Sequence, residues 1–122
     1  MLLKNFQCSH VFDNRTKNPL LFEAAWNVVF TPKMIDPLTG HETLGRWPRE
    51  FQPRFQNEVR RRFKPLLEKF NSLADQYRPR IEEAAKKIVS KHAELTDEER
   101  KAFVADALGQ WEKIEVKEQV CV

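Results

Sequence analysis

The sequence is poor in the residues from which most catalytic and cofactor sites are built. Its 122 residues include three glycines, two cysteines and three histidines. The glycines are not clustered, so no phosphate-binding loop is expected, and no Gly-x-Ser-x-Gly, His-Glu-x-x-His or Cys-x-x-Cys string occurs. We therefore expect no enzymatic activity and no cofactor in this chain itself, which leaves open a role as the non-catalytic subunit of an enzyme complex.

The possible metal ligands are too scattered to predict a metal site. Cys8 and His10 are two residues apart, but His41, His92 and Cys121 follow at no recognised ligand spacing. A structural zinc site takes four ligands, usually in closely spaced pairs. We expect no bound metal, and we expect the two cysteines to be free thiols in a reducing compartment.

Long hydrophobic runs are also absent. A membrane-spanning helix needs about 20 consecutive apolar residues, whereas the most apolar stretch, residues 20–30, is shorter and contains Glu23. The first residues lack the long apolar core of a secretory signal, and Asp13 argues against a mitochondrial presequence without excluding one. The expectation is no membrane span and an intracellular location, either the cytoplasm or the mitochondrial matrix.

Aromatic and charged residues are what the chain does have. It contains nine Phe and three Trp residues, and 32% of its residues are charged. The aromatic residues can bury enough area to order one core, and the high charge suits helices with solvated faces. We predict a single all-α domain, small and kinked, with an extended N-terminal arm and a long proline-rich loop.

The first half of this domain divides into an arm, a helix and a loop. Residues 1–17 show no clear period and are predicted to form an arm, which has room for a short strand. Asn18 and Pro19 are a typical helix start, so a hydrophobic helix is predicted over residues 18–30. This helix is apolar on nearly every side except at Glu23 and Asn27, which indicates burial within the domain or against another chain.

Residues 31–53 are predicted to be a proline-rich excursion. This stretch contains four prolines and two glycines, and it carries Trp47. Loops longer than about 12–15 residues are uncommon in compact domains unless they are functional or disordered. We expect the excursion to lie against a partner.

Residues 54–112 are predicted to be kinked helices followed by a tail over residues 113–122. Pro65 and Pro79 are expected to kink or restart the helix. Thr96 and Glu99 form a capping-box pattern that marks the start of the last helix. The tail alternates weakly and is predicted to be a strand or an ordered segment.

Positive charge is concentrated in residues 46–70. This segment holds eight Lys or Arg and three Glu residues, a local charge of +5 in a chain whose net charge is +3. The run Arg60 to Arg62 can be a solvated helix face, a binding surface for an acidic protein, or a phosphate-binding surface for RNA. Trp47 and the nearby phenylalanines resemble a base-stacking platform in composition, but helical spacing favours core packing.

Taken together, these patterns favour a non-catalytic accessory or assembly subunit that stabilises a larger protein complex. The alternative is an RNA-associated protein, such as a peripheral ribosomal subunit, that uses the basic face at Arg60 to Arg62. A third and weaker possibility is a small-ligand binder with a pocket near Trp26, Trp47 and Trp111. The residues predicted to contact the protein partner are Leu21, Trp26, Phe30, Trp47, Arg54, Arg60, Arg61 and Arg62.

Overall fold

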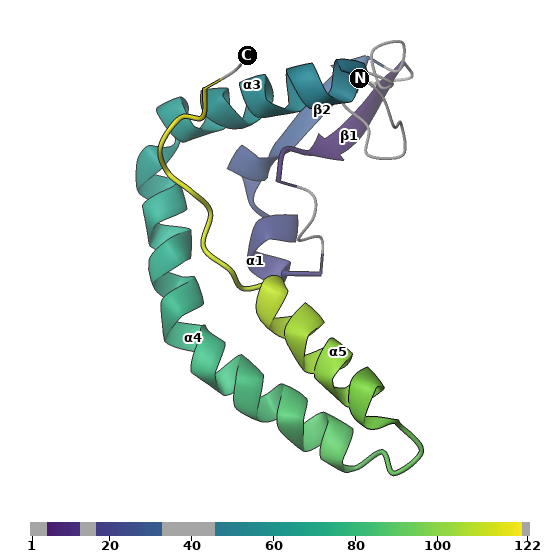
Figure 1. Ribbon diagram of the computed structural model, residues 1–122. Helices are drawn as coiled ribbons and strands as arrows, with labels where there is room; N and C mark the ends of the chain where they lie inside the picture. Colours follow the sequence, from purple (N-terminus) through teal and green to yellow (C-terminus); the bar gives the residue numbers. More distant parts are fainter. Residues whose placement is uncertain (1–4, 13–16, 33–45, 121–122) are drawn as a thin grey trace. The chain divides into compact units, whose positions relative to one another are not determined.

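The computed structural model describes residues 5–12, 17–32 and 46–120 (Figure 1). These residues are mostly helical and include one two-stranded sheet, so the predicted helical class is confirmed at that coarse level. Contacts along the chain divide it into two compact units, where the sequence predicts a single domain. Unit 1 comprises residues 1–65 and 115–122, and unit 2 comprises residues 66–114.

The sheet belongs to unit 1 and lies partly within the predicted arm. Strand β1 (Phe6–His10) pairs antiparallel with strand β2 (Val28–Pro32). Cys8 is opposite Phe30, and His10 is opposite Val28. Directly opposed side chains share a face and alternate residues lie on the same face, so this register places Phe6, Cys8, His10 and Phe30 on one side of the sheet.

The predicted helix over residues 18–30 is wrong beyond its first turn. Asn18 does cap a helix, but that helix, α1, covers only Pro19–Phe22. A short 3₁₀ helix, η2 (Ala25–Asn27), leads directly into β2. Two β-branched residues and an aromatic residue, Val28 to Phe30, suit a strand, and β1 supplies the partner that the local pattern could not reveal.

The predicted proline-rich excursion is shorter than residues 31–53. Its first two residues belong to β2, and helix α3 (Arg46–Arg62) includes its last eight. Pro48 lies in the first turn of α3, where a missing N–H breaks no helical hydrogen bond, and Pro53 lies inside the helix. The rest of the excursion, residues 33–45, falls outside the described residues.

Unit 2 is a pair of helices that run antiparallel in Figure 1. Helix α4 (Lys64–Ser90) is separated from α3 by one residue and continues through Pro79, and helix α5 (Asp97–Gly109) follows a short turn. The buried residues of α4 recur at helical spacing, at Leu67, Phe70, Ala74, Ala85 and Val89. Helix α5 buries none of its residues.

The predicted capping box is confirmed at the start of α5. The amide of Glu99 donates to Thr96 Oγ1 at 3.2 Å, and the amide of Thr96 donates to Glu99 Oε2 at 2.8 Å. Three acidic residues occupy the first turn of α5, where they complement the positive end of the helix dipole. The start of α5 is therefore determined by local capping interactions more than by burial of its side chains.

The segment after α5 contains no helix or strand through residue 120, the last described residue. Within unit 2 it follows α4: Asn71 Nδ2 donates to the Ile114 carbonyl, and the Ile114 amide donates to Asn71 Oδ1, both at 2.8 Å. Trp111 contacts the ring of Tyr77 at a centroid distance of 6.0 Å. Ordered side-chain contacts, not strand pairing, fix this part of the predicted tail.

Candidate protein-binding surface

Two buried asparagines hold the sheet and α1 of unit 1 together. Asn18 Oδ1 accepts hydrogen bonds from the amides of Leu20 and Leu21 and so caps α1. Asn27 Oδ1 accepts from the Phe12 amide at 2.8 Å, and Asn27 Nδ2 donates to the Leu21 carbonyl at 2.9 Å. Because both side chains are almost fully buried, their hydrogen bonds satisfy backbone groups that water cannot reach.

Helix α3 contributes polar side chains that form hydrogen bonds with the backbone just after β1 and with the backbone of the tail. Gln52 Nε2 donates to the Val11 carbonyl at 2.8 Å. Asn57 donates to the Gln119 carbonyl at 2.7 Å and accepts from the Gln119 amide at 2.8 Å. Arg60 Nε donates to the Glu115 carbonyl at 2.7 Å, and its guanidinium lies 5.3 Å from the centre of the Phe12 ring. These contacts join α3 to the end of β1 and to the tail.

The hydrogen bonds described above leave a group of mainly aromatic side chains exposed in unit 1. We call this group the aromatic face (Phe6, Cys8, His10, Phe22 and Phe30). Strand register places four of its members on one side of the sheet. Phe22 of α1 joins them because its ring stacks on His10 at a centroid distance of 5.0 Å. The exposed fractions of Phe30, Phe22 and Phe6 are 63%, 53% and 41%. Clustered exposed aromatic residues are typical of protein-binding surfaces.

A small pocket lies elsewhere in unit 1. Its volume is about 210 Å³, and its lining is mainly apolar, with Trp26, Phe55 and Val59 among the contributors. Glu58 and Arg62 are its charged members. Pockets for small molecules usually measure about 300–1,000 Å³, so this one better suits a single side chain of another protein.

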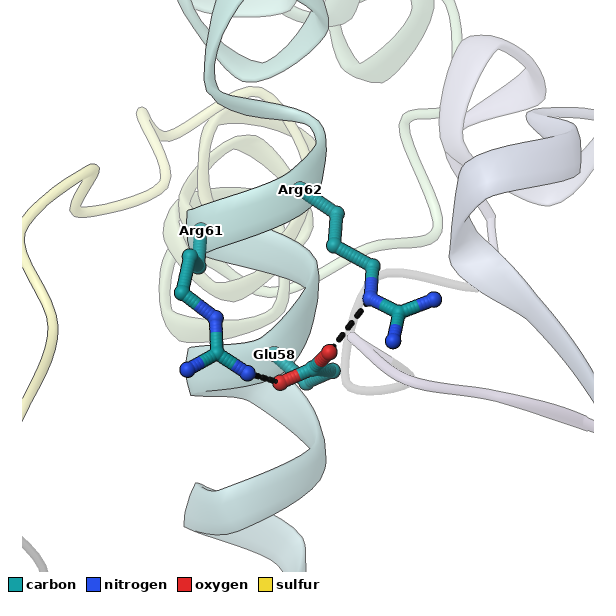
Figure 2. A network of polar contacts seen from close by, with 3 residues as sticks. All are labelled: Glu58, Arg61 and Arg62. Carbon is teal, nitrogen blue, oxygen red and sulfur yellow. Dashed lines mark hydrogen bonds and ion pairs between the residues drawn. The ribbon is translucent and has the colours of Figure 1, made fainter.

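Glu58 connects two exposed arginines of α3, Arg61 and Arg62 (Figure 2). Its two carboxylate oxygens accept hydrogen bonds from Arg61 and Arg62, one from each. The hydrogen bond from Arg62 is the largest influence and lowers the pKa of Glu58. Desolvation, the next largest, opposes it, and the positive charges of Arg61 and Arg62 add to the lowering, so the net shift is downward. The network keeps Glu58 ionised and neutralises part of the basic run.

The structure assigns different surroundings to the eight predicted contact residues. Leu21 is fully buried, and Arg60 is 4% exposed and bonded within unit 1, so neither presents a surface. Phe30 is exposed on the aromatic face, and Trp26 and Arg62 line the 210 Å³ pocket. Arg54 and Arg61 line a separate polar hollow with Asn57 and Glu118. The Trp47 side chain lies outside what the structure describes.

Sequence reasoning missed several residues of this surface. Phe22 and His10 were not connected, because their contact depends on the pairing of β1 with β2. Asn27 was interpreted as part of a polar helix strip, and Glu58 was only counted among the acidic residues of the basic segment. The spacing of Glu58 to Arg61 and Arg62, i to i+3 and i+4, is a signal that could have identified the ion-pair network.

Within the described ranges, no group of three or more His, Cys, Asp or Glu residues is arranged to hold a metal ion. The described helices likewise include none that combines the length and apolar character needed to cross a bilayer.

The fold and surface define a mostly helical protein with a small sheet that carries exposed aromatic residues. Comparison with known sequences adds a family: the chain belongs to the family described as "Uncharacterised protein PM1201", whose sequence model matches residues 1–116. One relative, "Uncharacterized protein PM1201" of Pasteurella multocida (strain Pm70), is 36% identical over 85 residues. The match covers 70% of this chain and 38% of the relative's length. No solved structure matches the chain significantly.

Proposed function

We propose that this chain is a non-catalytic accessory subunit that binds a larger protein through the aromatic face. The single observation that carries this proposal is the exposure of Phe6, Phe22 and Phe30 together on the aromatic face. Leaving three phenylalanine rings in water forgoes favourable burial, and contact with another protein would recover it.

The rigidity of the aromatic face supports binding to a protein. Phe30 is held in a paired strand, and Phe22 is held by its stacking on His10 and by the bond of 3.1 Å between His10 Nε2 and the Phe22 carbonyl. A surface that is ordered before binding loses less conformational entropy when it is covered. Aromatic anchors of this kind often dominate the binding energy of an interface.

The RNA-associated alternative has less support from the basic run. Of its three arginines, Arg60 is buried, and Arg61 and Arg62 both pair with Glu58. Phosphate binding would have to compete with that carboxylate for two of the guanidinium groups. We therefore place the protein-binding function first.

The proposal is tested by recovering the tagged full-length chain gently from its own cells and identifying every chain that co-elutes. We expect a defined protein partner, and we expect Phe30→Ser and Phe22→Ser each to weaken its binding by about 30-fold or more, as for interface hot spots. Val120→Ser is the matched control, because it also removes an exposed apolar side chain but lies outside the aromatic face.

Three results would contradict the proposal. The first is a monomeric chain that elutes alone, and the second is a partner that is retained equally by Phe30→Ser, Phe22→Ser and the wild type. The third is co-elution with RNA that is lost after nuclease treatment and in Arg61→Glu, which would establish the alternative function instead. Circular dichroism of each variant shows whether the fold is retained.

A further inference from the structure

Unit 2 contains an apolar groove that is lined by residues of both its helices. The groove lies between α4 and α5, has a volume of about 390 Å³, and takes most of its lining from Val89, Val104, Ala105 and Leu108. Helix α5 buries none of its residues, so its inner side is only partly covered by α4. Two antiparallel helices make an incomplete core, and packing a third against both is the usual way to close one.

The charged side chains that line the groove are all basic. They are Lys86, Arg100 and Lys101, and among the described residues no carboxylate lines it. Lys86 pairs with Glu82 at 2.6 Å, and Arg100 donates to the His92 carbonyl at 3.0 Å. Among the described residues, no side chain pairs with Lys101, which is exposed. An occupant with carboxylates beside its apolar side would therefore complement this lining.

We infer that the groove binds an amphipathic helix of a partner protein whose apolar face is flanked by Asp or Glu residues. The 13 residues of α5 span about 20 Å at 1.5 Å per residue, a length that a helix of three to four turns matches. A helix that binds in a groove inserts apolar side chains that are spaced three or four residues apart. Val104, Ala105 and Leu108 line the groove at a similar spacing, so they can pack against such side chains.

Other occupants fit the groove less well. A fatty acid would satisfy one cation, but the groove is open along its length, so much of the acyl chain would stay in water. A second copy of the chain could cover the groove with its own α5, yet the groove-lining positions of α5 include Arg100 and Lys101, which would bring like charges together. A partner helix with acidic flanks avoids both problems.

The inference rests on the proposed function in that both describe a protein-binding subunit, but it concerns different residues. Its test uses the intact chain and two synthetic 18-residue helical peptides with the same Leu/Ala face, one flanked by Glu and the other by Lys. Fluorescence anisotropy of labelled peptide measures the dissociation constant at low and at high salt. The expected result is binding of the acidic peptide, weakened by salt, with little binding of the basic peptide.

Variants then locate the binding site. Lys101→Glu should weaken binding of the acidic peptide by about tenfold, because a like charge then faces the peptide carboxylates. Ala105→Trp should abolish binding by filling the groove. Lys69→Glu is the matched control: it makes the same charge change at an exposed position of α4 that does not line the groove.

Several outcomes would overturn the inference. These are no binding of the acidic peptide, equal binding of both peptides, and binding that neither Lys101→Glu nor Ala105→Trp affects. A wild-type dimer in sedimentation that Ala105→Trp makes monomeric would assign the groove to a second copy, and binding of decanoate in place of the acidic peptide would assign it to an acyl chain. Since Phe22→Ser and Phe30→Ser leave the groove intact, the proposed function and this inference can fail separately.

Discussion

Replacing Asn27 by Ala tests the hydrogen-bonded frame that positions the aromatic face. The change removes the acceptor for the Phe12 amide and the donor to the Leu21 carbonyl, both inside unit 1. A typical hydrogen bond contributes about 0.5–1.5 kcal/mol, and a buried polar group left without a partner costs about 1–3 kcal/mol. Because Asn27 is 1% exposed, we expect the free energy of unfolding of unit 1 to fall by about 2–4 kcal/mol.

Hydrogen exchange read by mass spectrometry measures this loss locally. Peptides covering residues 6–12 and 19–32 should exchange roughly 30- to 700-fold faster in Asn27→Ala, since each 1.4 kcal/mol corresponds to a factor of ten. Asn71→Ala is the matched control, because Asn71 also makes two hydrogen bonds to backbone groups, but in unit 2. Its effect should appear around residues 110–116 and not in the sheet.

The reasoning is refuted if Asn27→Ala changes exchange in the sheet by less than about threefold, which corresponds to under about 0.7 kcal/mol. That result would mean that water or a shifted backbone satisfies the Phe12 amide and the Leu21 carbonyl at little cost. Equal effects of Asn27→Ala and Asn71→Ala on all peptides would also refute it, because unit 1 and unit 2 would then unfold together.

Two further predictions concern the helices. The Glu58 carboxyl should titrate below the ordinary glutamate pKa in an NMR experiment, so its ion pairs stabilise the fold above about pH 4.5 and this contribution is lost as the pH falls through the lowered value. Arg62→Ala should return that pKa toward 4.5 more than Arg61→Ala does, and an equal effect would contradict the leading role of the Arg62 hydrogen bond. Thr96→Ala should destabilise α5 by about 1 kcal/mol, seen as faster exchange over residues 97–109, while Thr96→Ser, which keeps the hydroxyl, should change little. Equal exchange in the alanine and serine variants would show that the cap does not hold this helix.

Local signals in the sequence predicted the parts of the fold that depend on neighbouring residues. The Asn18 cap and the Thr96 capping box are both present because each requires only a few adjacent residues. The helical class followed from such signals, and it is correct at that level.

Pairing between distant residues was the part that the sequence could not supply. Val28 to Phe30 continue an apolar run that fits a helix as well as a strand, and only β1, about 20 residues earlier, decides between them. The same limit applies to the three adjacent arginines. Arg60 is buried because the Glu115 carbonyl, 55 residues away, accepts its hydrogen bond, while Arg61 and Arg62 remain on the surface. The surface residues were therefore predicted only in part, and the partner, the compartment and the lack of catalysis stay predictions.

The way unit 1 is assembled from two separate stretches of chain has a consequence for its synthesis. Residues 66–114 form unit 2 from one continuous stretch, so its helices can pair soon after they leave the ribosome. Unit 1 needs residues 115–120, whose contacts with Asn57 and Arg60 join positions 62 and 55 residues apart. Until those residues emerge, Arg60 lacks the Glu115 carbonyl and Asn57 lacks the Gln119 backbone to which they bond. The sheet and α1 can therefore form early in synthesis, whereas the contacts of α3 with the tail must form late.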